Sequence, residues 1–132
     1  RIGEDVASLK LFPGIRKEVF QAVSRINQLK GLVIETYGSG NAPMLTWLDD
    51  ELKHLNEKGV LVLNVSQCLT GSVSQAKYET GQHLQNNNVI GGYDITFESA
   101  ITKMMYLLAC DDLSQEEKRN YLQTNIRGEI TL

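Results

Sequence analysis

Short apolar segments bounded by turn residues alternate along this chain with longer segments in which apolar residues recur at helical spacing. The apolar segments predict strands at residues 6–12, 31–37, 60–65 and 89–90. The longer segments predict helices at residues 15–26, 45–55, 76–84, 95–108 and 114–125. Strands that alternate with helices of about 10 to 15 residues are typical of βαβ units, and right-handed crossovers between such units give a parallel sheet covered on both faces. We therefore predict an α/β fold, a small three-layer α/β/α domain with a mostly parallel, roughly four-stranded, Rossmann-like sheet.

Several helix ends are marked by particular residues. Gly31 follows the last apolar position of the first helical segment and is interpreted as its stop, and Lys58 with Gly59 ends the second. Ser114 precedes Glu117 by three positions, which is the capping-box pattern of a helix start.

Length and composition limit the organisation of the chain. With 132 residues, of which 42% are hydrophobic, the chain fits one compact domain with a real core. Internal repeats and linker-like tracts are absent from the sequence. We therefore treat residues 1–132 as a single domain. Because the chain opens at Arg1 and not at a methionine, we expect it to be a piece of a longer protein.

Charge and cysteine content exclude several classes of function. The net charge is −3 with acidic and basic residues interspersed, so nucleic acid is not an expected partner. Cys68 and Cys110 form neither a CxxC motif nor a Cys/His cluster, which argues against a disulfide scaffold and against a metal site, and favours a reducing compartment. Since no window of about 18 apolar residues occurs, a membrane is not an expected partner either.

Two polar stretches follow predicted strands, at residues 38–43 and 66–72. Ligand sites of parallel sheets gather beyond the carboxyl ends of strands, and in the first stretch Gly38 and Gly40 permit close backbone approach while Asn41 offers an amide donor and a carbonyl acceptor. The same residues are also ordinary turn chemistry, so ligand binding and simple loop closure remain alternatives. Neither stretch completes a GxGxxG fingerprint or a P-loop, which disfavours nucleotide binding.

A complete catalytic set is not evident. Ser66, Cys68 or Ser72 would need a base within hydrogen-bond reach to act as a nucleophile. His54 and His83 both fall within predicted helices and not at strand ends. The acidic clusters at residues 49–51, 111–112 and 116–117 are interpreted as helix starts and solvated faces.

Four spaced motifs carry a resemblance to a known family. They are Thr-Tyr-Gly-Ser-Gly-Asn-Ala-Pro at 36–43, Asn-Val-Ser-Gln-Cys-Leu-Thr-Gly at 64–71, Tyr-Glu-Thr-Gly at 78–81 and Asn-Ile-Arg-Gly-Glu at 125–129. In this order they resemble the carboxyl-terminal domain of type I, cytoplasmic L-asparaginases.

The resemblance implies a cytoplasmic two-domain hydrolase that converts L-asparagine to L-aspartate and ammonia through a threonine nucleophile, without a metal or organic cofactor. In that family the Thr-Gly-Gly-Thr motif, the Thr-Asp turn and the Asp-Lys pair belong to the amino-terminal domain, and this chain contains none of them. The resemblance therefore implies no catalytic residue in this domain, and an isolated domain that is inactive.

The resemblance also implies partners and binding residues. Family members form homo-oligomers, as dimers or tetramers, in which this domain contacts its own amino-terminal domain and borders a neighbour's active site. The asparagine that reaches the substrate matches Asn41, and the effector site of regulated members matches Glu35, Asn41, Ser66 and Cys68. Glu35 stands where regulated members have an arginine, and its charge would repel an effector's carboxylate. We therefore expect no activation by asparagine.

Two competing hypotheses remain. An asparaginase-like subunit of an archaeal-type tRNA-dependent amidotransferase shares this domain architecture. A stand-alone, non-catalytic module that binds an amino acid would need no upstream catalytic domain.

Overall fold

The computed structural model describes residues 5–12, 14–36, 46–66, 89–91, 96–110 and 112–126. Within these ranges the chain forms a four-stranded sheet in the order β1-β2-β3-β4, and every neighbouring pair is parallel. The strands are β1 (Val6–Lys10), β2 (Gly31–Thr36), β3 (Leu61–Ser66) and β4 (Ile90–Gly91). The predicted α/β class and parallel sheet are confirmed, because each short apolar segment in the described ranges is a strand.

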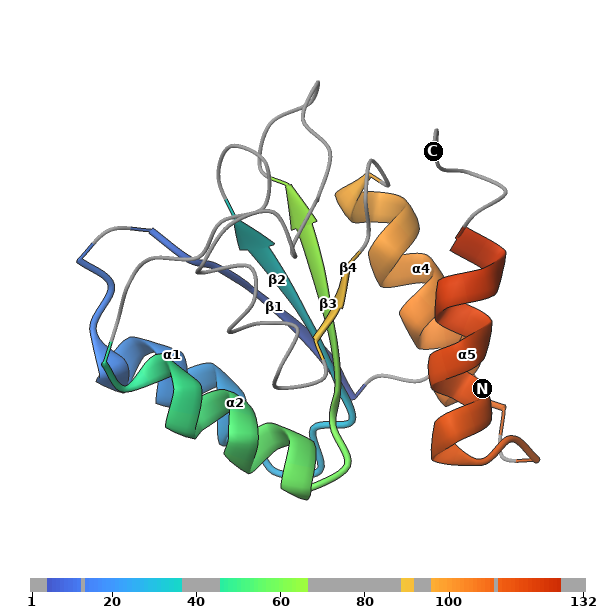
Figure 1. Cartoon of the computed structure of the whole chain (residues 1–132), viewed down its shortest axis with the longest axis horizontal. Coiled ribbons are helices and arrows are strands. Elements are labelled where there is room, and N and C mark those ends of the chain that lie inside the picture. Colours follow the sequence, from blue (N-terminus) through green and yellow to red (C-terminus); the bar gives the residue numbers. More distant parts are fainter. Residues whose placement is uncertain are drawn as a thin grey trace.

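Helices cover both faces of this sheet (Figure 1). They are α1 (Lys17–Ser24), α2 (Leu48–Glu57), α4 (Phe97–Leu108) and α5 (Gln115–Ile126). Figure 1 shows α1 and α2 together on one side of the sheet and α4 and α5 on the other, so the three-layer prediction is confirmed. The predicted helix at 76–84 lies outside the described residues. Among those described, no helix has the length and apolarity that crossing a bilayer requires.

Two apolar clusters fill the spaces between the layers. Leu32, Ile34 and Val62 face the first cluster, which includes Phe20 of α1 and Leu52 and Leu55 of α2. Val33, Leu63 and Val65 face the second, which includes Ala100, Met104 and Leu107 of α4 and Leu122 of α5. Successive strand residues thus point to opposite layers, which explains why strands buried on both faces are apolar at nearly every position.

The order of the strands follows the sequence, so α1 and α2 are successive crossovers on the same face. Among the four described strands the order does not reverse, and no switch-point crevice arises between them. A binding site in the described part of the sheet therefore depends on what stands at the strand ends.

Gly31 begins β2, as the predicted strand at 31–37 has it. Its interpretation as the stop of the first helix is wrong, because α1 ends at Ser24 and the left-handed residue of the turn is Gln28 (φ 65°). A Cβ at Gly31 would lie 2.8 Å from Met104 Cγ and 2.8 Å from Leu108 Cδ1. The side chains of Met104 and Leu108 therefore pack closely on this backbone, and a Cβ at Gly31 would force them to shift.

The start of α5 has the predicted capping box. The Glu117 amide donates to Ser114 Oγ (3.1 Å), and the Ser114 amide donates to Glu117 Oε1 (2.9 Å). The hydrogen bonds with Ser114 lower the pKa of Glu117 below its ordinary 4.5, the bond from the Ser114 backbone amide contributing most. The Gln115 side-chain amide donates to the Gly59 carbonyl, which joins the start of α5 to the turn before β3. Gly59 has φ 78°, in agreement with its predicted place beyond the end of α2.

Candidate functional site

The carboxyl ends of the four parallel strands lie at one edge of the sheet, which we call the carboxyl edge. The backbone pairing of Thr36 with Ser66 places the ends of β2 and β3 side by side. Residues 37–45 and 67–88 follow these two ends directly in the sequence. The two polar stretches singled out in the sequence therefore follow strand ends that lie side by side.

Of the four predicted binding residues, two belong to the described part of this edge. Glu35 is described completely, and the backbone of Ser66 is described as the last residue of β3. Asn41 and Cys68 lie outside the described residues. The structure thus brings the backbones of Glu35 and Ser66 to adjacent strands, while the roles of all four residues stay predictions.

Two buried polar side chains at the carboxyl edge were not predicted as site residues. The Thr36 hydroxyl donates to Asn64 Oδ1 at 2.8 Å, and both residues have an exposed fraction of 0%. The Val65 carbonyl oxygen lies farther from the same hydroxyl, at 3.4 Å. The signal that could have found this pair is a polar residue near the carboxyl end of each of two strands that are apolar in their first half.

The strand register separates Glu35 from this pair. Thr36 and Asn64 have the same parity along their strands as Ile34 and Val62, so they point to the α1/α2 layer. Glu35 has the parity of Val33, and its half-buried side chain belongs to the α4/α5 side. A ligand that contacts the Glu35 carboxylate therefore approaches from the face opposite to Thr36 and Asn64.

One acidic cluster differs from the prediction that it is a solvated face. Asp49 and Asp50 are exposed in the first turn of α2, as predicted, but Glu51 is buried. Its carboxylate accepts hydrogen bonds from Gln21 Nε2 (3.0 Å) and Arg25 Nη2 (3.2 Å) on and next to α1. Glu51 is one turn along the helix from Leu48 and lies next to Leu52, so helical spacing turns it inward to join the two helices.

Two of the other candidate reactive groups, His54 and Cys110, are described in the structure. His54 is half-buried in the last turn of α2, and the Cys110 thiol donates to the Tyr106 carbonyl oxygen at 3.4 Å. In the described ranges, no group of three or more His, Cys, Asp or Glu side chains could hold a metal ion. His83 and Cys68 are outside those ranges.

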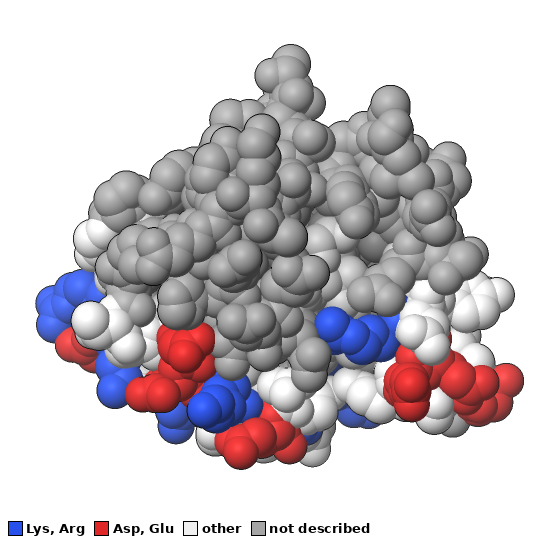
Figure 2. All heavy atoms as spheres, viewed as in Figure 1, with Lys and Arg blue, Asp and Glu red and all other residues white. Residues whose placement is uncertain are grey.

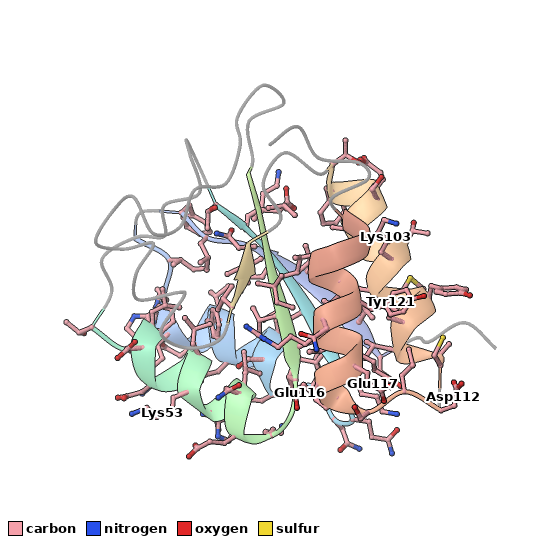
Figure 3. The ribbon with its side chains drawn as sticks, turned by 45° about the vertical axis from the view of Figure 1, so that its right-hand side comes forward. Lys53, Lys103, Asp112, Glu116, Glu117 and Tyr121 are labelled. Atoms are coloured by element: carbon pink, nitrogen blue, oxygen red, sulfur yellow. The ribbon has the colours of Figure 1, made fainter. Side chains whose placement is uncertain are left out.

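Away from the carboxyl edge, the outer surface of α4 and α5 is hollowed. Thr102, Lys103, Tyr106, Leu107 and Tyr121 line a hollow of about 290 Å³, and Figure 3 shows Lys103 and Tyr121 on these two neighbouring helices. On the face drawn in Figure 2, acidic and basic side chains of the described residues are intermixed.

Known proteins similar to this chain share one domain with it. Residues 5–122 match the family model of the glutaminase/asparaginase C-terminal domain. L-asparaginase 1 of Escherichia coli (strain K12) is 36% identical over 128 residues, which are 97% of this chain and 37% of that protein. The 60 kDa lysophospholipase of Homo sapiens is 38% identical over 128 residues, which are 97% of this chain and 22% of that protein.

Two further similarities bear on the alternatives. A glutamyl-tRNA(Gln) amidotransferase subunit of Pyrococcus abyssi is 36% identical over 131 residues, covering 99% of this chain and 29% of that protein. The crystal structure of L-asparaginase I from Vibrio cholerae superposes with a TM-score of 0.88 at 39% identity, covering 97% of this chain and 38% of that one. In each case this chain spans well under half of the similar protein's length.

Proposed function

This chain belongs to the glutaminase/asparaginase C-terminal domain family, and we propose that its residues 1–132 are the carboxyl-terminal domain of an L-asparaginase. The full-length enzyme would hydrolyse L-asparagine to L-aspartate and ammonia in the cytoplasm. The observation that carries this proposal is similarity over nearly the whole chain: 97% of it aligns with L-asparaginase 1 of E. coli and with the V. cholerae structure.

The proposal divides the work between two domains. The threonine nucleophile and its helpers would lie in an amino-terminal domain outside these 132 residues, with no metal or organic cofactor. Two observations support this division. The Cys110 thiol donates to a backbone carbonyl and not to a base, and the chain spans 37% of the E. coli relative, which leaves room there for a second domain.

The carboxyl edge would serve binding. We propose that Asn41 reaches the substrate at the active site of a neighbouring subunit in a homo-oligomer, as a dimer or tetramer. Glu35, Asn41, Ser66 and Cys68 would border an effector site. The pairing of Thr36 with Ser66 supports only the proximity of the two strand ends, since Glu35 points to the α4/α5 side of the sheet. The Glu35 carboxylate would repel an amino acid's carboxylate, so the enzyme would not be activated by asparagine.

Ammonia release tests the proposal. The full-length protein should release ammonia from L-asparagine, and the 132-residue chain alone should release none. Asn41→Ala should weaken substrate use by about 1 to 3 kcal/mol, since a polar partner of the ligand is lost. Asn87→Ala, the same substitution in the run of asparagines at 86–88, is the matched control and should change kcat/KM less than twofold (about 0.4 kcal/mol). Ammonia release by the isolated chain would contradict the division of labour.

A tRNA-dependent amidotransferase is the second candidate, because the P. abyssi amidotransferase subunit is, like the E. coli enzyme, 36% identical to this chain. Intermixed surface charge favours the free-standing asparaginase (Figure 2). The two proposals differ in one measurement. Free-standing activity requires asparagine alone, whereas an amidotransferase would release ammonia for use on charged tRNA. Fatty-acid release from a lysophospholipid, measured in a separate assay, tests the activity that the name of the human relative states.

A further inference from the structure

The buried hydrogen bond between Thr36 and Asn64 has no part in the chemistry of the proposed asparaginase, yet it occupies the carboxyl edge. The Thr36 hydroxyl and the Asn64 carboxamide oxygen are 2.8 Å apart, and neither residue has exposed surface. Their neighbours on the same sheet face, Ile34 and Val62, are apolar. Two apolar side chains would satisfy burial there, so the pair contributes something other than apolar packing.

The bond crosses the last rungs of the β2/β3 ladder. Ile34 pairs with Asn64 and Thr36 pairs with Ser66, so the side-chain bond runs diagonally from the end of β2 to a residue inside β3. Thr36 and Ser66 form the last pair of the described ladder, so the side-chain bond lies at the end of that pairing. A satisfied polar pair in a low-dielectric interior resists separation of the two strand ends and specifies one geometry.

We propose that Thr36 and Asn64 are positioning residues, which hold the ends of β2 and β3 at a fixed separation and so place the segments 37–45 and 67–88 relative to each other. The effect of this pair on ligand binding rests on the proposed function. In that proposal Asn41, in the first segment, and Cys68, in the second, are binding residues. The pair acts on ligand binding through these segments and contacts no substrate.

Amide hydrogen exchange on the full-length protein tests the placement directly. Thr36→Val keeps the shape of the side chain and removes the donor, and it should speed exchange at least about threefold in peptides from both segments (roughly 0.7 kcal/mol). Thr36→Ser retains the hydroxyl and should leave exchange at the wild-type rate. Unchanged exchange in Thr36→Val would overturn the proposal.

Steady-state kinetics test the consequence for the ligand. Thr36→Val should raise the KM for L-asparagine about tenfold (1.4 kcal/mol) while kcat changes less than twofold, since the catalytic groups are elsewhere. Thr36→Ser should restore the wild-type KM. Asn64→Leu should have a similar effect to Thr36→Val, and the double variant should be no worse than the worse single variant, because both changes remove the same bond.

A stability control separates positioning from a general loss of folding. Leu61→Ala removes a buried side chain at the opposite end of β3 and should lower the melting temperature at least as much as Thr36→Val. It should leave KM and the exchange of both segments unchanged. A tenfold KM increase in Leu61→Ala as well would overturn the positioning role.

The outcomes distinguish the two proposals. If the wild-type protein releases no ammonia from asparagine but Thr36→Val speeds exchange in both segments, the function is wrong and the positioning role holds. If the wild-type protein is active and Thr36→Val changes neither exchange nor KM, the function holds and the positioning role is wrong.

Discussion

The two ends of the same pair of strands are built from different side chains. At the amino end, Gly31 pairs with Leu61, and both lie beneath the side chains of α4. At the carboxyl end, Thr36 and Asn64 meet through a hydrogen bond. Apolar contact at the first end needs only matching shape, whereas a buried polar pair must be satisfied by a partner at a set distance. The contrast assigns apolar packing to the amino end, and it is the basis of our proposal that the carboxyl end serves placement.

Helix α4 explains why the amino end is so closely packed. Met104 and Leu108, from the carboxyl-terminal half of α4, approach the position that a Cβ on Gly31 would occupy. The start of α5 reaches the same end of the sheet through Gln115 and the Gly59 carbonyl. Two helices are therefore fixed to this end of the sheet.

The greatest loss of stability is expected at the amino end. Leu61→Ala removes a side chain that is 3% exposed and should lower the free energy of unfolding by about 2 to 5 kcal/mol, measured by urea denaturation. Val19→Ala, at an exposed position of α1, is the control and should stay within about 0.5 kcal/mol of wild type. A loss below about 1 kcal/mol in Leu61→Ala would contradict the contrast, because the amino end would then not be the stabilising end.

Adding a side chain at the amino end, where the previous variant removes one, tests the same packing. Gly31→Ala should cost about 1 to 3 kcal/mol of unfolding free energy, since the added methyl group overlaps Met104 Cγ and Leu108 Cδ1 at 2.8 Å. Combining it with Leu108→Val should recover part of the loss in the same denaturation experiment. If Gly31→Ala is as stable as wild type, the side chains of Met104 and Leu108 yield to the added methyl group and the packing argument fails.

At the carboxyl end, the unfolding free energy should depend on the hydrogen bond between Thr36 and Asn64. Thr36→Val leaves the buried Asn64 oxygen without this donor and should cost about 1 to 2 kcal/mol of unfolding free energy. Combining it with Asn64→Leu replaces both partners by apolar groups and should return the free energy to within about 1 kcal/mol of wild type. Additive losses in the double variant would show that the two side chains stabilise the fold independently.

The cap of α5 should give the weakest response of the four. Ser114→Ala should cost about 1 kcal/mol, because the Glu117 amide loses its side-chain acceptor. The pKa of Glu117 is lowered in the folded protein, so its contribution is present above pH 4.5 and is lost as the pH falls through the folded-state value. Glu117→Gln should therefore unfold with a weaker dependence on pH in the acid range. An unchanged pH profile would exclude a contribution from the cap carboxylate.

Much of the fold could be predicted because its signals are local. Apolar runs at 31–37 and 60–65 predicted β2 and β3, helical spacing predicted α2 and α4, and Ser114 with Glu117 predicted the start of α5. The candidate site was predictable only in its location at the strand ends. The sequence grouped Glu35 with Ser66, and chain position alone does not assign a side chain to a sheet face relative to its neighbours.

The elements, their parallel arrangement and the family could all be read from the order of the residues, because periodicity, caps and spaced motifs are properties of consecutive positions. Four other facts required the folded chain: Gly31 makes room for α4, Glu51 is buried against α1, Glu35 faces away from Thr36, and Thr36 bonds to Asn64. Each of these facts joins residues that are far apart in the chain or on neighbouring strands. The distance between such residues depends on how the sheet brings separate segments together, so it cannot be predicted from a local sequence pattern.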